Sequence, residues 1–364
     1  MKRSLFEPVL GVLIDPSADR AFELGRPPEH AYPHLGPMGV ESGRRVVFFP
    51  PNGVDRSAQA ASGWEYAAGR WRRARFPLPA AVYNRLARRP LEARGPVCRL
   101  RKYLGKNRLF FNPRFLAKNE ALAALSRRGV STPRFAVPKS AGDLVDAVRA
   151  FGVAYLKPAD GSLGRGIAKV ERAAGRGLER FTVTANGAAP GPPARMAGGP
   201  AFFARFAGML LASGAYLVQE GVELPEVGGG PADLRALVQR TAAGWSLTGV
   251  AGRAALPGHI STHTVRGGRR VDFEEVAKAC GVHRAAVEDL VRRAAEAVEA
   301  ELGLAFFEFS ADIAPAPGAR LFVLEMNAKP FPFDEEEIRI TAGHRLLEFA
   351  LKAPGERTEP CGIG

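Results

Sequence analysis

The stretch Lys157-Pro158-Ala159-Asp160-Gly161-Ser162-Leu163-Gly164-Arg165-Gly166-Ile167 places a lysine directly before a glycine-rich run. We expect it to form a strand, a loop and a second strand, because glycine accepts backbone angles that other residues avoid. The N–H groups of such a loop can close on phosphate oxygens, with the lysine beside them. Taken alone, a glycine-rich loop after a strand is most often only a turn.

Oxygen-bearing side chains recur further along the chain, at Asp312 and in the run Leu321-Phe322-Val323-Leu324-Glu325-Met326-Asn327. Glu325 and Asn327 should share one face of a strand, because side chains alternate. Asp312 and Glu325 lie 13 positions apart, which leaves room for a strand end, a turn over residues 315–318 and a returning strand. Oxygen ligands on rigid strands suit Mg²⁺ held against a polyphosphate, although an E-x-N pair alone is common on edge strands. Together the two segments predict a protein that binds Mg-nucleotide.

Length and composition set outer bounds on the fold. The chain has 364 residues with 46% apolar content, enough for two or three domains with real cores. It has no apolar run of 18 residues and no apolar segment near its start, so we expect neither a membrane span nor a signal peptide. Three scattered cysteines without a C-x-x-C pair favour a reducing cytoplasm. His30 and His34 have helical spacing, but surrounding prolines argue against a metal site there.

The net charge of +14 is concentrated in one span. Between Arg70 and Lys118 there are fifteen Lys or Arg residues and one acid, Glu92. The span is either a solvated face or a landing surface for an anionic partner, such as an acidic small molecule, peptide or polymer. Interleaved aromatic residues favour a binding surface, but no nucleic-acid-binding motif accompanies them. We therefore predict an acidic substrate, reached across a face bearing Arg85, Arg88 and Arg89, in preference to a nucleic-acid partner.

The pattern of apolar runs predicts three regions and a tail. Residues 1–112 should form a small α/β domain with strands at 9–14, 45–49 and 81–85 and a hairpin over 64–71. Residues 113–351 should form the nucleotide-binding part, divided at residue 215, and residues 352–364 a tail. In the first of these parts we expect a helix entered at Asn112-Pro113, a helix over 141–151, the glycine-rich loop, and a mobile insertion over 185–200.

The second part, residues 216–351, carries the remaining expected elements. They are a strand over 216–222, a hairpin of 236–240 with 245–253, two helices within 273–303 broken near Gly281, metal-bearing strands at 305–309 and 321–326, and a helix over 335–350. This order indicates an α+β fold rather than a parallel P-loop fold. The sequence contains no G-x-x-x-x-G-K-[ST] motif, which excludes the main rival nucleotide-binding fold.

At this point a family resemblance is visible. It rests on Tyr83-Asn84-Arg85, Phe111-Asn112-Pro113-Arg114-Phe115 with Lys118, Gln219-Glu220-Gly221-Val222, Asp233-Leu234-Arg235-Ala236-Leu237-Val238-Gln239, Trp245 to Arg253, Gly267-Gly268, and Glu325-Met326-Asn327-Ala328-Lys329-Pro330. In order and spacing these runs resemble the YheC/YheD family of ATP-grasp proteins, described as endospore coat-associated in spore-forming bacteria. The likeness covers roughly residues 80 to 350, and implies an ATP-grasp fold preceded by a small N-terminal domain.

Carried over to this sequence, the resemblance implies roles for named residues. Asp312, Glu325 and Asn327 would hold Mg²⁺. Arg235 and Arg253 would face the γ-phosphate and the charge that develops at the reacting centre. Thr262-His263 departs from the Thr-Asn of many relatives, which leaves that loop's contacts in doubt. The ATP-binding set would comprise Lys118, Lys157, Gly161, Ser162, Gly164, Gly166, Gln219, Glu220, Val222, Glu223 and Asp233, with 219–222 as the adenine hinge and Glu223 near the ribose.

The resemblance also implies a reaction: phosphorylation of a carboxylate to an acylphosphate, followed by attack of an amine to form an amide. Loop 160–166 would close over the acylphosphate and exclude water. The alternatives are an ATP-binding structural or coat-assembly protein without ligase turnover, and a nucleic-acid-associated protein that uses the basic span. We expect a cytoplasmic location, on the mother-cell side or at the spore coat. The sequence does not fix the two substrates or the oligomeric state.

Overall fold

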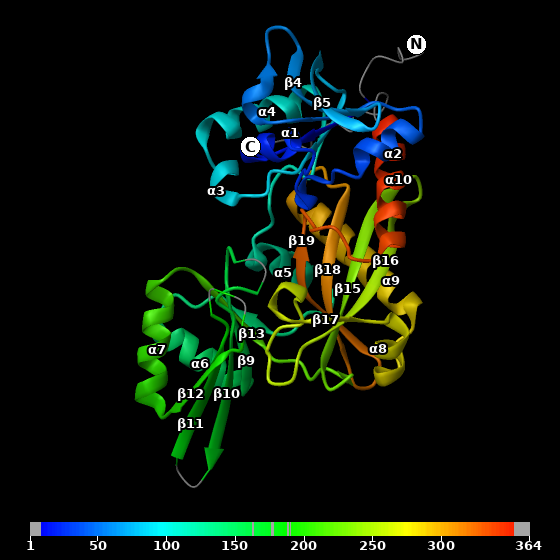
Figure 1. The fold of residues 1–364 in the computed structure, drawn as a ribbon. Helices are drawn as coiled ribbons and strands as arrows, with labels where there is room; N and C mark the ends of the chain where they lie inside the picture. The colour runs from blue at the N-terminus through cyan, green and yellow to red at the C-terminus, as the bar shows by residue number, and fades with distance from the viewer. Residues whose placement is uncertain (1–8, 162–163, 176–177, 188, 190, 353–364) are drawn as a thin grey trace.

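A computed structural model describes residues 9–161, 164–175, 178–187, 189 and 191–352 of the chain. Its strands form three sheets, coloured blue to cyan, green, and yellow-green to orange in Figure 1. The blue N-terminal lobe lies above the third sheet, and the green sheet lies below it to one side. Short 3-10 helices occur at Pro16–Ala18, Glu29–Ala31, Pro51–Gly53 and Thr264–Arg266.

The first sheet has a parallel centre and an antiparallel flank. The parallel strands are β1 (Leu10–Leu13), β2 (Val46–Phe49), β6 (Ala81–Asn84) and β7 (Leu109–Phe111); the flank is β3 (Val54–Asp55), β4 (Ala60–Ala67) and β5 (Arg70–Pro77). Its helices are α1 (Asp19–Glu23), α2 (Leu35–Glu41), α3 (Arg89–Glu92) and α4 (Gly95–Asn107). The β4–β5 hairpin turns at Ala68 and Gly69, both with positive φ as a tight hairpin requires, and confirms the hairpin predicted over 64–71.

The second sheet carries the glycine-rich loop. Its order is β12 (Ala194–Gly198), β11 (Leu178–Ala185), β10 (Ala168–Gly175), β9 (Val153–Pro158), β13 (Tyr216–Glu220) and β8 (Phe135–Ala136). Helices α6 (Ala141–Phe151) and α7 (Pro200–Ala212) pack their apolar residues into its core, and a capping box of Ser140 and Asp143 begins α6. The expected strand–loop–strand is confirmed, because β9 and β10 pair antiparallel on either side of the loop.

Two sequence predictions for this region are wrong. The helix expected from Asn112-Pro113 begins only at Lys118, as α5 (Lys118–Arg127), because the preceding Ala117 has an extended backbone. The segment expected to be an insertion over 185–200 contains β12, which pairs with β11 at the edge of the sheet. The division of the chain at residues 112, 215 and 351 stays a prediction.

The third sheet forms the centre of the molecule. Its order is β17 (Arg269–Val271), β16 (Gly244–Ala254), β15 (Gly230–Thr241), β18 (Glu308–Ala316) and β19 (Arg320–Asn327), and β14 (Glu226–Val227) pairs with β15. Helices α5, α8 (Phe273–Cys280) and α9 (Arg284–Leu302) cover one face. The two helices and the break at Gly281 are as predicted, and Gly281 has the positive φ of a helix end. The strand expected at 305–309 is wrong, because β18 runs from Glu308 and places Asp312 in mid-strand.

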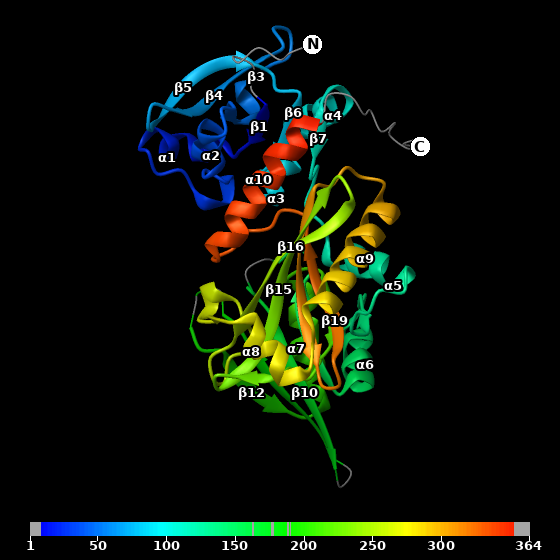
Figure 2. The same cartoon turned by 90° about the vertical axis from the view of Figure 1, so that its right-hand side faces the viewer.

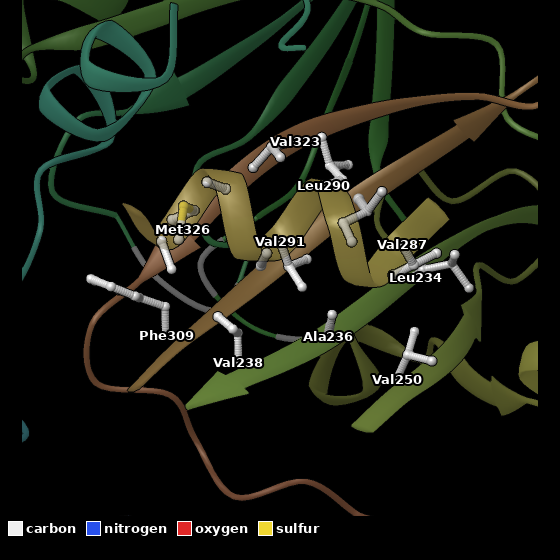
Figure 3. Close-up of a cluster of buried hydrophobic side chains, with 14 of the residues drawn as sticks. Leu234, Ala236, Val238, Val250, Val287, Leu290, Val291, Phe309, Val323 and Met326 are labelled. Atoms are coloured by element: carbon white, nitrogen blue, oxygen red, sulfur yellow. The ribbon is translucent and has the colours of Figure 1, made fainter. Parts of the chain in front are cut away.

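Alternation along the third sheet separates its core from its other face. Leu234, Ala236 and Val238 of β15 point toward Val287 and Val291 of α9 (Figure 3). The intervening residues Asp233, Arg235 and Leu237 therefore point away from the helices. On this second face Leu237 packs against Ile338 and Ala342 of α10 (Glu336–Lys352), which leaves the part around Asp233 and Arg235 available for binding.

The last described helix, α10 (Glu336–Lys352), joins the first lobe to the rest of the chain. Its residues Leu346, Leu347 and Ala350 are buried in the core of the first sheet, together with Phe307. The red helix beside the blue lobe shows this packing in Figure 2. Among the described helices, no segment is long and apolar enough to cross a membrane.

Candidate active site

A cavity of about 390 Å³ opens where the three sheets meet. The second sheet contributes residues of β9, the glycine-rich loop and β13, and the third sheet contributes residues of β15, β16, β18 and β19. The first lobe adds Arg85, Leu86 and Ala87, which directly follow β6. Because these segments are far apart in sequence, the cavity exists only in the folded chain.

Strand pairing sets polar residues side by side on the cavity face of the third sheet. Arg235, Asp312 and Glu325 are directly paired across β15, β18 and β19. Ser310 pairs with Asn327 in the same strands. The pairing shifts near Leu324, since Asp312 faces Glu325 while Ile313 faces Val323. This bulge changes the alternation, so that Val323 faces the helices while Glu325 and Asn327 face the cavity.

Arg253 of β16 connects two aspartates of the cavity, the buried Asp233 and the half-buried Asp312. Its guanidinium donates to both oxygens of Asp233, at 3.0 and 2.8 Å, and lies 3.1 Å from Oδ1 of Asp312. Thr262 donates a further hydrogen bond to Asp233 at 2.7 Å. Burial raises the pKa of Asp233 against the attraction of Arg253, whereas for Asp312 the charges of Arg253 and Arg235 outweigh burial and lower the pKa.

Two lysines enter the cavity from different elements. Nζ of Lys118, the first residue of α5, lies 2.5 Å from Oε1 of Glu325. Nζ of Lys157 on β9 donates to Oε1 of Gln219 at 2.5 Å. Burial lowers the pKa of Lys157 to about 8, and Lys118 adds to this while Glu325 opposes it. Lys157 thus carries a buried positive charge whose hydrogen-bond partner is neutral.

The donor chemistry of Asp312, Glu325 and Asn327 fits a hard divalent cation. The three side chains supply carboxylate and amide oxygens from paired positions of two rigid strands. Among the described residues there is no cluster of three His, Cys, Asp or Glu that would hold a metal by itself. The set suits Mg²⁺, which is commonly bound by one or two carboxylates together with substrate phosphates.

The comparison with known families agrees with this geometry. A family model described as YheC/D like ATP-grasp matches residues 107–352. This chain belongs to that family. The endospore coat-associated protein YheD of Bacillus subtilis (strain 168) is 26% identical over 310 residues, which cover 80% of this chain and 65% of YheD. The chain thus spans slightly less than two thirds of the length of that relative.

Solved structures extend the likeness to the whole fold. A D-cycloserine synthetase, DcsG, superposes with a TM-score of 0.55 and 15% identity, covering 94% of this chain and 99% of that chain. A Chryseobacterium gregarium RiPP-associated ATP-grasp ligase, solved with ADP and a leader and core peptide, gives a TM-score of 0.51 and 12% identity, covering 95% and 97%. At these identities the likeness concerns the fold, and it confirms the predicted α+β ATP-grasp architecture.

The structure brings most of the predicted site residues together. Those that line the cavity are Lys118, Lys157, Gly161, Gly164, Gln219, Glu220, Val222, Asp233, Arg235, Arg253, Asp312, Glu325 and Asn327. Glu223 and Gly166 do not line it, although Gly166 lies one residue from the lining Arg165 and Ile167. Ser162 lies outside the described residues. Their roles stay predictions.

Two glycines of the loop are required by its geometry. Gly164 and Gly166 have φ of +66° and +67°, which disfavours any other residue there. A Cβ on Gly164 would approach Oγ of Ser261 to 3.0 Å, and the carbonyl of Gly164 accepts from Asn186 at 3.1 Å. The glycine-rich loop thus packs against the segment that carries Thr262 and His263.

Sequence reasoning placed Arg85 wrongly. It was expected on a solvent-exposed face with Arg88 and Arg89, but its side chain is buried and lines the cavity. It donates to the carbonyls of His30, at 3.0 Å, and Pro330, at 2.8 Å, and its guanidinium stacks 4.2 Å from the ring centre of Tyr32. Its position directly after a parallel strand was the available signal, because ligands bind at the carboxyl ends of such strands.

Much of the basic span is compensated by acids from outside it. Eight of its fifteen cations form an ion pair within the described chain. In seven of these eight pairs the acid lies outside residues 70–118. Arg88, for example, pairs with the buried Asp15 at 2.9 Å, and Arg89 lies 3.8 Å from Asp160 of the glycine-rich loop. The span is therefore less positive in the folded protein than its composition suggests.

Lys329 and two histidines are further cavity residues that the sequence did not single out as ligands. Nζ of Lys329 lies 2.5 Å from Oε1 of the buried Glu92 and donates to the Leu86 carbonyl at 3.1 Å. This pairing ties β19 to the first lobe. His30 and His263 each have a buried ring nitrogen without a hydrogen-bond partner in the described chain.

Proposed function

We propose that this protein is an ATP- and Mg²⁺-dependent carboxylate–amine ligase. The observation that supports this most directly is the convergence of Asp312, Glu325 and Asn327 with Lys118 and Lys157 on one cavity. Three oxygen ligands face two lysines there, which is the charge arrangement that a Mg-bound triphosphate needs. Arg235 and Arg253 stand on neighbouring strands of the same face.

In this proposal the nucleotide lies between the second and third sheets. Lys118 and Lys157 contact its phosphates as mobile point charges, and the segment 219–222 borders the adenine. Gln219 fixes the position of Lys157 and donates to the Leu324 carbonyl at 3.2 Å, so it links the hinge to the metal-bearing strand. Asp312, Glu325 and Asn327 would hold Mg²⁺. The ion would supply there the positive charge that Lys118 and Arg253 supply in this structure.

The chemistry then requires positioning and charge stabilisation rather than an enzyme nucleophile. A carboxylate oxygen of the acid attacks the γ-phosphorus, ADP leaves, and an acylphosphate forms. The amine attacks the acyl carbon, phosphate leaves, the C–N bond forms, and the amine loses a proton. Arg253 is held rigidly by Asp233 and Asp312, and Arg235 lies beside Asp312, so both guanidiniums are preorganised near the charge that develops on the transferred group.

The substrate and setting are further parts of the proposal. We infer an acidic substrate, a cytoplasmic or spore-coat location, and a spore- or envelope-related process; the name of the Bacillus subtilis relative supports the last. That name equally supports the alternative, an ATP-binding coat-assembly protein without turnover. The two functions differ in whether ATP hydrolysis or transfer depends on an acid.

Hydroxylamine provides a test that needs no knowledge of the natural amine. It captures acylphosphates as hydroxamates, so Mg-ATP, a panel of carboxylic acids and hydroxylamine should give ADP and hydroxamate in equal amounts. Lys157→Met should abolish both, because it removes the buried charge beside the phosphates while keeping an apolar side chain of similar length. Lys169→Met is the matched control, since Lys169 pairs with Glu171 away from the cavity. Tight Mg-ADP binding without acid-dependent ADP release across the panel would favour the coat-assembly alternative.

A further inference from the structure

Two arginines from different sheets meet at one short segment of the cavity wall. Arg85, after β6, donates from Nη2 to the carbonyl of Pro330 at 2.8 Å. Arg235, on β15, donates from Nη2 to the carbonyl of Phe331 at 2.9 Å and stacks 4.6 Å from the ring centre of Phe333. Both line the cavity, and the consecutive carbonyls of residues 330 and 331 accept from the two guanidiniums.

These two charges differ in their partners from three other cations of the same cavity. Lys118, Arg253 and Lys329 each have a carboxylate within 3.1 Å. Within the described ranges, neither Arg85 nor Arg235 forms an ion pair; their hydrogen bonds go to carbonyl oxygens and, for Arg85, also to the Tyr83 hydroxyl at 3.1 Å. The carboxylate of Glu308 acts on Arg85 through its charge without an ion pair, and it accepts hydrogen bonds from Tyr83 and Gln239. Burial raises the pKa of Glu308. Arg85 is buried, whereas the half-buried Arg235 lies beside Asp312 on the next strand. A buried guanidinium that pairs directly with no carboxylate is costly unless a ligand supplies further negative charge.

Both arginines also keep N–H groups for a ligand. A guanidinium has five N–H donors, of which the described chain occupies three on Arg85 and one on Arg235. Their stacking on Tyr32 and Phe333 fixes the planes of both forks. A rigid planar fork matches a carboxylate through two parallel hydrogen bonds.

Their place relative to the reacting centre indicates which carboxylate they bind. Arg235 is paired directly with Asp312 at the edge of the proposed metal site and also donates to residue 331, so it borders both the reacting centre and the space toward Arg85. Arg85 belongs to the first lobe beyond residues 330–331. A carboxylate that is being phosphorylated must lie at the metal site. The positive charge of Arg85 is therefore available to a second anionic group of the same substrate. His30, with its unpartnered Nε2, and the apolar side chains of Leu86 and Phe115 line the same part of the cavity.

We propose that Arg85 and Arg235 form a subsite for a second carboxylate, so that the acid substrate is a dicarboxylic acid or a molecule ending in an acidic residue. This inference rests on the proposed ligase function, because it assigns the other carboxylate to phosphorylation. It replaces the expected surface of Arg85, Arg88 and Arg89 by a pair of cavity arginines as the source of selectivity for acids.

Equilibrium binding tests the subsite without turnover. Malonate, succinate and glutarate, each beside its monoamide, are titrated calorimetrically into the full-length protein loaded with Mg-ADP. At least one diacid should bind about tenfold or more tightly than its monoamide, because only the diacid fills the two-guanidinium site. Arg235→Gln should remove this preference. Arg85→Lys, which keeps the charge and loses the planar fork, should weaken it several-fold.

Arg99→Gln is the matched control, since Arg99 belongs to the same basic span but is exposed on α4 and does not line the cavity. Its diacid preference should equal that of the unmodified protein. Equal affinity for every diacid and its monoamide would overturn the proposal, as would a preference that survives Arg235→Gln and Arg85→Lys.

The subsite and the ligase function can fail separately. Hydroxamate formed equally well from monocarboxylic acids and diacids would retain the ligase and remove the subsite. A diacid preference that depends on Arg235, found together with no hydroxamate from any acid, would retain the subsite and remove the ligase.

Discussion

At the scale of single residues, Glu325 is the most informative position of the proposed metal site. It pairs with Lys118 and lies opposite Asp312 across the strands. Glu325→Gln removes one negative charge from a site for a hard cation, so Mg²⁺-dependent turnover should fall by about 100-fold or more, as when one preorganised electrostatic group is lost. The variant should remain folded, as judged by circular dichroism and urea unfolding.

The control for this variant is Glu301→Gln. Glu301 also accepts from arginines, Arg127 and Arg128, but it lies away from the cavity. Its turnover should be unchanged. If Glu325→Gln unfolds the protein, Glu325 is a structural partner of Lys118 and the metal assignment is wrong.

A second prediction at this scale concerns pH. Burial, with smaller effects from Arg339 and Arg85, lowers the pKa of His34 to about 4 from its ordinary 6.5. Between pH 6.5 and 4 the unfolded chain therefore binds a proton that the folded chain excludes, so stability is full above pH 6.5 and falls as the pH decreases. This histidine alone should make the protein about 2 kcal/mol less stable at pH 5 than at pH 7. The free energy of unfolding is measured with urea at pH 5 and at pH 7. The difference between the two values should be smaller in His34→Phe than in the unmodified protein, by about 2 kcal/mol.

The sequence predicted which residues share a strand face where one strand pattern was enough. The shared face of Glu325 and Asn327 follows from alternation, and both line the cavity. The bulge at Leu324 that turns them there has no signature in the sequence, because it arises from pairing with β18. Arg85 was misplaced for a similar reason: its partners His30 and Pro330 come from other parts of the chain, so an arginine in a basic run looked like a surface residue.

At the scale of elements, local signals located the hairpins and helices, and tertiary context decided the exceptions. The hairpin of β4 and β5 and the break at Gly281 depend on glycine in turns, which is a local property. The start of α5 was predicted too early because proline is common at the first position of a helix. Here Pro113 lies in the segment that precedes the helix. Strand β12 was missed because its small residues have low strand propensity, and pairing with β11 overrides that preference.

Helix α10 supports a prediction about the first lobe. Its Leu347 is fully buried in the core of the first sheet, with Leu346 and Phe307. A fragment of residues 1–112 lacks all three, so we expect it to show no cooperative urea transition when expressed alone. A fragment that unfolds cooperatively would show that this core is complete without α10.

The same core can be tested in the full-length protein. Leu347→Ala should lower the free energy of unfolding by about 2–5 kcal/mol, the usual cost of removing a fully buried leucine side chain. Leu351→Ala, one turn further along α10 at a half-buried position, is the matched control and should cost clearly less.

At the scale of the whole molecule, folding redistributes the charge that the sequence displays. The basic span pairs with acids such as Glu65, Asp19 and Asp55 of the same lobe. Linear composition cannot show this, because those partners become neighbours only through strand pairing and loop packing. Within the described chain, the cations of this span that are exposed and form no ion pair include Arg99, Lys102 and Lys106 on α4.

These three exposed cations allow surface attraction to be separated from recognition in the cavity. Fields from exposed charges act over about 8–10 Å and weaken with salt, whereas buried charges are screened much less. If Arg85 and Arg235 select the substrate, replacing Arg99, Lys102 and Lys106 together by Ser should change KM for a small diacid by less than about twofold, and raising the salt concentration should have an equally small effect. A rise in KM of tenfold or more in the triple variant, reproduced by high salt in the unmodified protein, would instead assign selectivity for acids to α4 and point to a large acidic partner that reaches this helix.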